Sequence, residues 1–253
     1  MNRFTSIFHF LLNAKKRHGV HSPYIFSLTD VGLRTKVSES NQNQLNTYRK
    51  FLQNNPEKIE IEDFGAGSKK HGTTRSIQQI FSISSSKKKY GKLLYQLAHH
   101  FEVKNVLELG TNLAWGTYNL HLGAPEAKIV SIEGCKSIFE FNQKHFPKTE
   151  NIAFVHATFD DYIAKLTDEK FDLIFIDGDH RGASLLRYIS ALKKHTHNET
   201  IWIFDDIRWS DDMWETWNQL IQEKEFHVSI DMLRLGIVVQ REQQMKEHFL
   251  IRP

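Results

Sequence analysis

The sequence predicts an α/β fold built around an open, doubly wound and mostly parallel sheet. From Tyr90 onward, short apolar runs of strand length alternate with segments whose apolar residues recur at helical spacing. Strands that alternate with helices in this way form parallel sheets through right-handed crossover connections. The last two apolar runs, Phe226–Met232 and Leu235–Gln240, follow each other without a helix between them, which predicts an antiparallel hairpin.

Each strand predicted before the hairpin is a short apolar run, as is typical of buried parallel strands. These five strands are expected at Asn105–Leu109, Lys128–Ile132, Ile152–His156, Phe171–Ile176 and Thr200–Phe204. The helices that accompany them are expected at Tyr90–Phe101, Ala114–Leu122, Ser137–Phe146, Asp160–Leu166, Ala183–His195 and Asp211–Lys224. Together with the hairpin, these elements assign residues 85–241 to one α/β domain.

The first 84 residues have a different pattern from the rest of the chain. They combine amphipathic helical pieces with polar turns, and the polar stretch Ser82–Lys89 marks the junction. We expect residues 1–84 to form a helical extension that caps the substrate side or makes a homodimer contact. Residues 242–253 are expected to form a C-terminal tail. A chain of 253 residues is long enough to bury the core of one such domain with an appended segment.

Composition restricts the classes of function. The 33 basic and 30 acidic residues leave a net charge of +3, which is too small a surplus to indicate nucleic-acid binding. The single cysteine, Cys135, excludes an internal disulfide framework and any multi-cysteine metal site. The apolar start of the chain is short and is interrupted by His9, so we expect an amphipathic helix there rather than a signal peptide. No stretch approaches the roughly 20 apolar residues that span a bilayer, and we expect the protein in the cytoplasm.

The residues that follow the predicted strands carry the functional signal. A doubly wound sheet binds its ligand at the carboxyl ends of its strands, near the point where the strand order reverses. The residues at those ends, which should surround one cleft, are Gly110, Glu133, Ala157, Asp177 and Asp205. Because three of these five residues are carboxylates, the sequence predicts a polar binding site at this edge.

Gly110 and Gly116 bracket the turn from the first strand into the following helix. Glycine accepts positive φ and lets the backbone approach a ligand closely, and the helix start offers free N–H groups to an anion. Glu133 ends the second strand, where a carboxylate can take both hydroxyls of a ribose. The loop lacks the central glycine of a dinucleotide-binding loop, so NAD is disfavoured. Each feature alone is consistent with a simple turn, but together they predict a nucleoside-type cofactor.

The segment Val106-Leu-Glu-Leu-Gly110, followed by Gly116, Glu133 and the closing hairpin, resembles the class I S-adenosylmethionine (SAM)-dependent methyltransferases over about residues 88–241. The resemblance implies a Rossmann-like, seven-stranded sheet whose last strand is antiparallel. It places Glu108 and Gly110 beside the methionine part of SAM, Glu133 on the ribose, and Thr158 and Phe159 near the adenine. The full set of cofactor-binding residues that it implies is Glu108, Gly110, Thr111, Gly116, Glu133, Thr158, Phe159 and Asp177.

Further acidic residues follow the fourth and fifth strands, in Asp177-Gly-Asp179-His180 and in Asp205-Asp206. Neighbouring parallel strands would bring Asp177 close to this second pair, and carboxylates so close repel each other unless a cation or basic group lies between them. Oxygen ligands with open positions suit Mg²⁺ or another hard divalent cation, which can orient a substrate oxygen and lower its proton affinity. The alternative is that Asp177 contacts the cofactor or caps a helix, while Asp205-Asp206 caps the next helix.

This acidic pattern is similar to that of metal-dependent O-methyltransferases of the catechol, caffeoyl and, above all, macrocin-like sugar types. The resemblance implies metal ligands at Asp177, Asp205 and Asp206. It implies a general base at Asp179, or at His180, which stands where the catechol type has a lysine and can accept a proton at neutral pH. The implied reaction is methyl transfer from SAM to a hydroxyl of a small molecule or sugar. A metal-independent methyltransferase acting by proximity and a non-catalytic SAM-binding module remain alternatives.

Three further features carry weaker predictions. The glycine-containing segment Asp63–Lys70 looks like a second cofactor loop, but no strand-length apolar run follows it, so a turn is the simpler interpretation. His18 and His21 lack a third ligand nearby, which favours a loop over a zinc site. Trp209, beside the acidic pair, is the aromatic residue that we most readily place at a substrate mouth.

Overall fold

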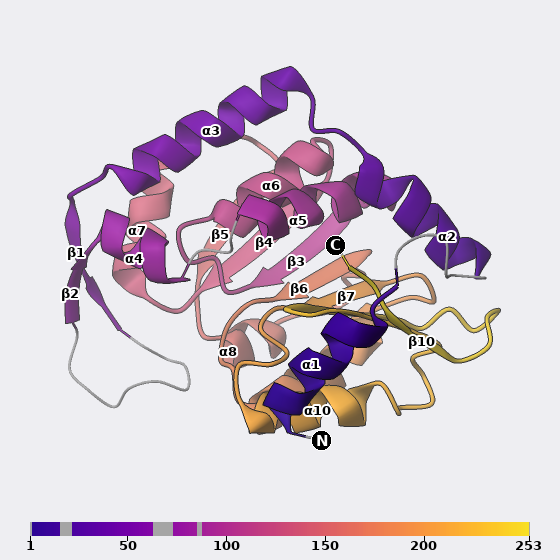
Figure 1. Cartoon of the computed structure of the whole chain (residues 1–253). Helices are drawn as coiled ribbons and strands as arrows, with labels where there is room; N and C mark the ends of the chain where they lie inside the picture. The colour runs from indigo at the N-terminus through magenta and orange to yellow at the C-terminus, as the bar shows by residue number, and fades with distance from the viewer. Residues whose placement is uncertain (1, 16–21, 63–72, 85–87, 253) are drawn as a thin grey trace.

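A computed structural model describes residues 2–15, 22–62, 73–84 and 88–252 of the chain (Figure 1). In this described part, the central sheet has eight strands in the order β10-β8-β9-β7-β6-β3-β4-β5. Strand β9 is antiparallel to both of its neighbours, and the other neighbouring pairs run parallel. The strands are β3 (Asn105–Leu109), β4 (Lys128–Glu133), β5 (Ile152–His156), β6 (Leu173–Ile176), β7 (Ile201–Phe204), β8 (Val228–Met232), β9 (Leu235–Val239) and β10 (Glu247–Leu250).

The predicted α/β class with a doubly wound sheet is confirmed, and the seven expected strands form close to their predicted positions. The difference is β10, which pairs in parallel with β8 and makes an eighth strand at the sheet edge. The segment 242–253, expected to be a C-terminal tail, supplies this strand. The sequence of β10 is half exposed and lacks the apolar run by which a buried strand is recognised.

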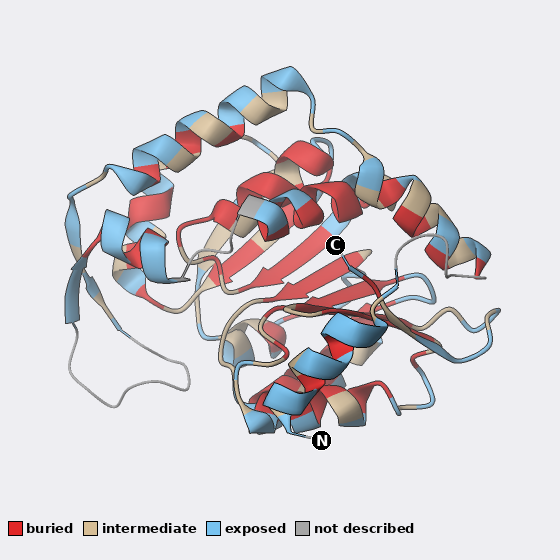
Figure 2. Cartoon of the chain, in the orientation of Figure 1, coloured by how far each residue is buried: buried red, intermediate tan, exposed pale blue. Residues whose placement is uncertain are grey.

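Helices cover both faces of the sheet because alternate strand residues point to opposite sides (Figure 1). One apolar core joins α5 to strand residues such as Val106 and Ile203, while the other joins α9 and α10 to residues such as Leu107 and Trp202. Figure 2 shows inner strands such as β3 and β6 as buried over most of their length, whereas the edge strands β5 and β10 are partly exposed. The helices of this domain are α5 (Lys88–His100), α6 (Trp115–Gly123), α7 (Lys136–His145), α8 (Phe159–Ile163), α9 (Gly182–Leu192) and α10 (Asp211–Leu220).

The N-terminal segment packs against this domain. Ile25 and Leu28 are fully buried in the core on one face of the sheet, and Leu52 is fully buried in a third cluster that includes Trp115 of α6. The segment also contains a two-stranded antiparallel sheet that the sequence analysis missed, because its short strands are mostly exposed and lack an apolar run. The N-terminal elements are α1 (Arg3–Asn13), α2 (Pro23–Asp30), α3 (Glu39–Gln53), β1 (Lys58–Ile61), β2 (Thr73–Ser76) and α4 (Ile77–Ser84).

Two of the weaker predictions fall outside the described residues. These are the glycine-containing segment from Asp63 to Lys70 and the pair His18 and His21. The amphipathic helix expected at the start of the chain is α1, which buries Phe10 and exposes Phe4, Phe8 and Leu12. Within the described ranges, no helix combines the length and the apolar character needed to cross a membrane.

Candidate active site

The strand order reverses between β3 and β6, and the carboxyl ends of these two strands lie side by side. Gly110, directly after β3, has a φ of 108°, and a Cβ placed on it would lie 2.0 Å from the backbone oxygen of Asp177, directly after β6. Only glycine permits this approach and this conformation. Positive φ values also occur at Asn112, Asp179 and Asp206, and such strained backbone is concentrated at functional sites. The turn after β3 and the end of β6 are therefore in close backbone contact at the edge where the sequence predicts the binding site.

Glu108 supports the loop from within the protein. It is 1% exposed, and its Oε2 accepts hydrogen bonds of 2.5 Å from the hydroxyls of Thr117 and Ser131. A Cβ on Gly116 would lie 2.8 Å from the other carboxylate oxygen, so glycine at this position leaves room for Glu108. Burial raises the pKa of Glu108 to about 7, although the two hydroxyl donors lower it.

The raised pKa of Glu108 makes stability depend on pH. The group ionises near 4.5 in the unfolded chain but only near 7 in the folded one, so stability should fall as pH rises between these values. We expect Glu108→Gln to be more stable than the wild type near pH 8, by up to about 3 kcal/mol, and close to it at the acidic end of this range. Urea unfolding near pH 5 and near pH 8 measures the difference. The exposed Glu140→Gln serves as control, and an equal effect of Glu108→Gln at both pH values would contradict the assignment.

The loop and Glu133 lie together, as the cofactor prediction requires. Glu133 Oε2 accepts a hydrogen bond of 2.8 Å from the Asn112 backbone N–H, and Oε1 accepts one of 2.8 Å from the Cys135 N–H. Thr111 is buried, and its hydroxyl lies 2.6 Å from that of Ser131 on the adjacent strand. The glycine-bounded loop and the acid that ends β4 therefore form one structural unit.

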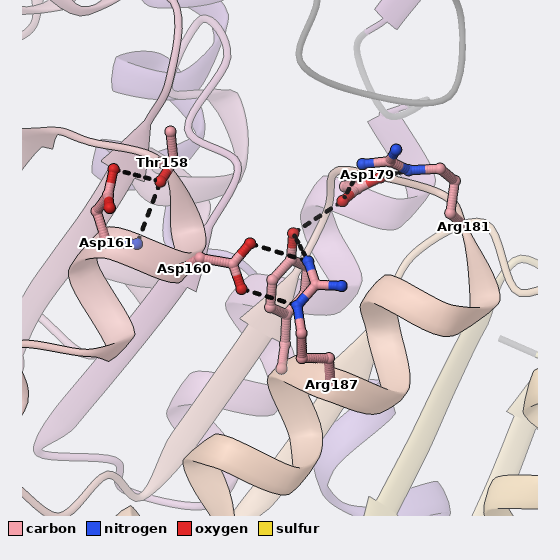
Figure 3. A network of polar contacts seen from close by, with 7 residues as sticks. Thr158, Asp160, Asp161, Asp179, Arg181 and Arg187 are labelled. Carbon is pink, nitrogen blue, oxygen red and sulfur yellow. Dashed lines mark hydrogen bonds and ion pairs between the residues drawn. The ribbon is translucent and has the colours of Figure 1, made fainter.

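Thr158 and Phe159 stand at the start of α8, beside the end of β6. The Thr158 hydroxyl caps this helix: it accepts a hydrogen bond of 3.1 Å from the Asp161 N–H and donates one of 2.7 Å to the Asp161 carboxylate (Figure 3). The Phe159 ring packs edge-on against Tyr188, with 5.5 Å between ring centroids. A Cβ on Gly178 would lie 3.0 Å from the Phe159 ring. The segment after β6 therefore contacts the start of α8.

Asp179 is held in a network of polar contacts (Figure 3). Arg181 donates to both of its carboxylate oxygens, and the Tyr188 hydroxyl donates to it at 2.8 Å. Burial alone would raise its pKa, but the hydrogen bonds from Arg181 and Tyr188 lower the pKa of Asp179 below its ordinary value. A carboxylate that is stabilised in this way is a weak proton acceptor.

His180 faces the acidic pair that follows β7. Its Nε2 lies 4.0 Å from Asp206 Oδ2, and its ring lies 5.7 Å from that of Trp209. Burial lowers the pKa of His180, which favours the neutral imidazole at pH 7. Trp209 is 57% exposed, so the structure places it at the rim of this part of the site.

The structure adds a basic residue, Arg234, to the predicted acidic cluster. Arg234 lies in the turn between β8 and β9, and its Nε and Nη2 donate hydrogen bonds of 2.7 Å to the two carboxylate oxygens of Asp205. Its Nε also lies 3.1 Å from Asp206 Oδ1. Arg234 is 28 positions from Asp206 in the sequence, and only the pairing of β9 with β7 brings it here. No local sequence pattern marks Arg234 as part of this cluster.

The guanidinium of Arg234 occupies carboxylate oxygens that a divalent ion in this acidic cluster would need. Burial, followed by the charges of Asp205 and Asp206, raises the pKa of Asp177 well above its ordinary value, and burial with Asp205 raises that of Asp206 to about 6. Both oxygens of Asp205 are engaged by Arg234. Among the residues that the structure describes, no group of three or more His, Cys, Asp or Glu side chains is placed to hold a metal ion. In this arrangement the residues do not fit the metal site that the resemblance implied.

The strand order, the glycine-bounded loop and the acid after β4 define the class: this is the fold of the class I SAM-dependent methyltransferases. Residues 107–207 also match a family described as a methyltransferase domain. This segment runs from β3 to just beyond β7, so it includes the loop, Glu133 and both acidic clusters. Over this segment the chain is therefore similar to a methyltransferase domain. No curated protein sequence matches the chain.

Solved structures with this fold are similar to the chain over most of their length. An O-methyltransferase from Bacillus cereus, in complex with S-adenosylhomocysteine, is 15% identical; the match covers 84% of this chain and 94% of that one, with a TM-score of 0.56. The methyltransferase PaMTH1 from Podospora anserina, also bound to S-adenosylhomocysteine, is 13% identical, with coverages of 81% and 97% and a TM-score of 0.54. TomG, an O-methyltransferase from Streptomyces achromogenes in complex with SAM, is 14% identical, with coverages of 62% and 82% and a TM-score of 0.51. These similarities establish a shared fold.

Proposed function

We propose that this protein transfers a methyl group from SAM to a hydroxyl of a small molecule. The observation that carries the proposal is the hydrogen bond from the Asn112 N–H to Glu133. It joins the cofactor loop to the residue that we expect to bind the ribose of SAM. The solved structures with the same fold include O-methyltransferases bound to SAM or to S-adenosylhomocysteine, which supports the choice of cofactor and of acceptor atom.

SAM supplies an electrophilic methyl group on a sulfonium, and the protein residues bind and orient it. The Glu133 carboxylate is held by the backbone N–H groups of Asn112 and Cys135, and in the proposed complex it accepts the ribose hydroxyls while it stays attached to the loop. Gly110, Thr111 and Gly116 form the loop against the methionine part, with Glu108 behind it. Asp177 and the pair Thr158 and Phe159 complete the cofactor site towards the sulfonium and the adenine, respectively.

His180 is the better of the two proposed bases. Asp179 is stabilised as an anion by Arg181 and Tyr188, which reduces its tendency to take a proton. The pKa of His180 is lowered by burial, so its neutral form is available at pH 7. In the proposed reaction the acceptor hydroxyl gives its proton to His180 as its oxygen bonds to the methyl carbon and the carbon–sulfur bond breaks. The products are a methyl ether, S-adenosylhomocysteine and a proton on the imidazole.

Glu133→Ala tests the cofactor part of the proposal. We expect it to weaken SAM binding about 30-fold, equivalent to ~2 kcal/mol, because two charge-assisted hydrogen bonds to the ribose are lost. Calorimetric titration of SAM into wild type and variant measures the loss. Glu140→Ala, which removes an exposed glutamate from α7, is the matched control and should bind SAM as the wild type does. Unchanged affinity in Glu133→Ala would overturn the ribose assignment.

Two other proposals predict different results with the same protein. A non-catalytic SAM-binding module would bind SAM but transfer no labelled methyl group to any member of a diverse hydroxyl panel. A metal-assisted enzyme, which the resemblance of the acidic pattern implied, would lose its activity on chelation and regain it with Mg²⁺ or another divalent cation.

A further inference from the structure

Arg234 is fixed in the acidic cluster from several sides. Its backbone N–H donates to the carbonyl of Met232 within the β8–β9 turn, and its carbonyl accepts a hydrogen bond of 3.1 Å from the Ile207 N–H after β7. The guanidinium lies over the Tyr90 ring, with 5.6 Å between Cζ and the ring centroid. The turn, the segment after β7 and the start of α5 therefore hold this cation in place.

The guanidinium keeps donor capacity for a ligand. Its Nε and Nη2 are engaged by Asp205 and Asp206. Within the described ranges, no hydrogen bond is found for Nη1, which carries two N–H groups. The side chain is 22% exposed, whereas that of Asp205 is fully buried. A ligand that enters beside His180 and Asp206 would thus meet a positive charge before it meets the buried carboxylate.

We propose that Arg234 is the built-in cation of the acceptor site and binds the acceptor oxygen where the metal-dependent O-methyltransferases use a divalent ion. This inference rests on the function proposed above. The acceptor hydroxyl gives its proton to His180, and negative charge develops on its oxygen until the bond to the methyl carbon forms. A guanidinium N–H aimed at that oxygen stabilises the charge without a metal ion. Arginine is suited to the role because it remains charged and presents its donors in a rigid plane.

The charge balance of the cluster supports this role. Asp177, Asp205 and Asp206 converge at the ends of β6 and β7, so their repulsion has to be offset by a cation. Arg234 supplies that charge from the protein itself, through two hydrogen bonds of 2.7 Å to Asp205. A divalent ion would have to displace this bidentate pair before it could bind Asp205.

The first test compares metal dependence in the wild type and in Arg234→Ala. We expect the methyl-transfer rate of the wild type to be unchanged after dialysis against a chelator and after addition of Mg²⁺ or Mn²⁺. Arg234→Ala should lose about 100-fold or more in kcat/KM for the acceptor, as enzymes do when a donor to the developing charge is removed, while SAM affinity stays close to that of the wild type. Its melting temperature should also rise on addition of Mn²⁺, unlike that of the wild type, because the oxygens of Asp205 and Asp206 that Arg234 occupied can then bind the ion.

Two variants keep the test decisive if Arg234→Ala folds poorly. Arg234→Lys retains the charge but not the planar fork, so we expect an intermediate loss of kcat/KM. Arg241→Ala is the matched control: Arg241 has a similar exposed fraction, 23%, pairs with Glu199 at 2.7 Å and lies 4.1 Å from the Tyr24 ring, away from the acidic cluster. It should leave kcat/KM unchanged.

The proposal is overturned if chelation abolishes wild-type activity and a divalent cation restores it, or if Arg234→Lys is as active as the wild type. Failure of the underlying function has a separate signature, since the wild-type protein would then show no SAM binding or no methyl transfer at all.

Discussion

Replacement of His180 by glutamine should lower kcat by about 10²- to 10⁴-fold, the range that general-base catalysis commonly contributes. Glutamine preserves a polar side chain of similar reach next to Asp206 and Trp209 but cannot take the hydroxyl proton. Because we assign His180 to the acceptor rather than to the cofactor, we expect SAM affinity to remain near the wild-type value. Single-turnover transfer of a labelled methyl group, with calorimetry for SAM, measures both quantities.

Asp179→Asn is the informative companion to this variant. Asp179 is already hydrogen-bonded by Arg181 and Tyr188, so we expect it to position the segment before His180, and its replacement should cost less than about tenfold in kcat. If Asp179→Asn carried the large loss and His180→Gln were nearly normal, the base would be the carboxylate and our assignment would be reversed.

Gly110→Ala should have the second large effect, on both stability and cofactor binding. A Cβ at this position would lie 2.0 Å from the Asp177 backbone oxygen, and the φ of 108° is unfavourable for any L side chain. The loop or the end of β6 must therefore move, and we expect a loss of about 3 kcal/mol or more in the free energy of unfolding. Chemical denaturation measures the stability, and calorimetry measures the accompanying loss of SAM affinity.

Ala114→Gly, in the same loop, is the opposite substitution and serves as its control. Ala114 has a φ of 52°, a left-handed conformation that glycine adopts at least as readily as alanine. The free energy of unfolding should therefore change by less than about 1 kcal/mol. Comparable destabilisation by the two substitutions would show that general sensitivity of the loop, rather than the contact with Asp177, explains the result.

The sequence was sufficient to predict the parts of the fold that depend on local pattern. Strands such as Asn105–Leu109 and Ile201–Phe204 are covered on both faces of the sheet. Because both faces are buried, these strands are short apolar runs that can be recognised in the sequence. Gly110 was identifiable because the turn after the strand requires a residue without a side chain, and Glu133 because a carboxylate at a strand end can bind a ribose. The strand β10 and the antiparallel pair β1 and β2 are largely exposed and have no such apolar run.

The chemistry of the acidic cluster was predictable only in part. The clustering of Asp177 with Asp205 follows from the adjacency of parallel strands, which alternation of strands and helices indicates. Their partner Arg234 comes from the β8–β9 turn, and no local pattern distinguishes it from any other arginine in a turn. The hydrogen bonding of Asp179 likewise depends on Tyr188, a side chain of α9 that reaches the segment after β6. Charged and hydrogen-bonding partners that come from distant elements can be identified only from the structure.

Titration of SAM into the wild-type protein, with NADH as the competing ligand, determines which cofactor this fold binds. We expect one SAM site per chain, competition by S-adenosylhomocysteine and no binding of NADH. Tight NADH binding without any response to SAM would contradict the assignment, because the site at the ends of β3 and β4 would then belong to a different cofactor.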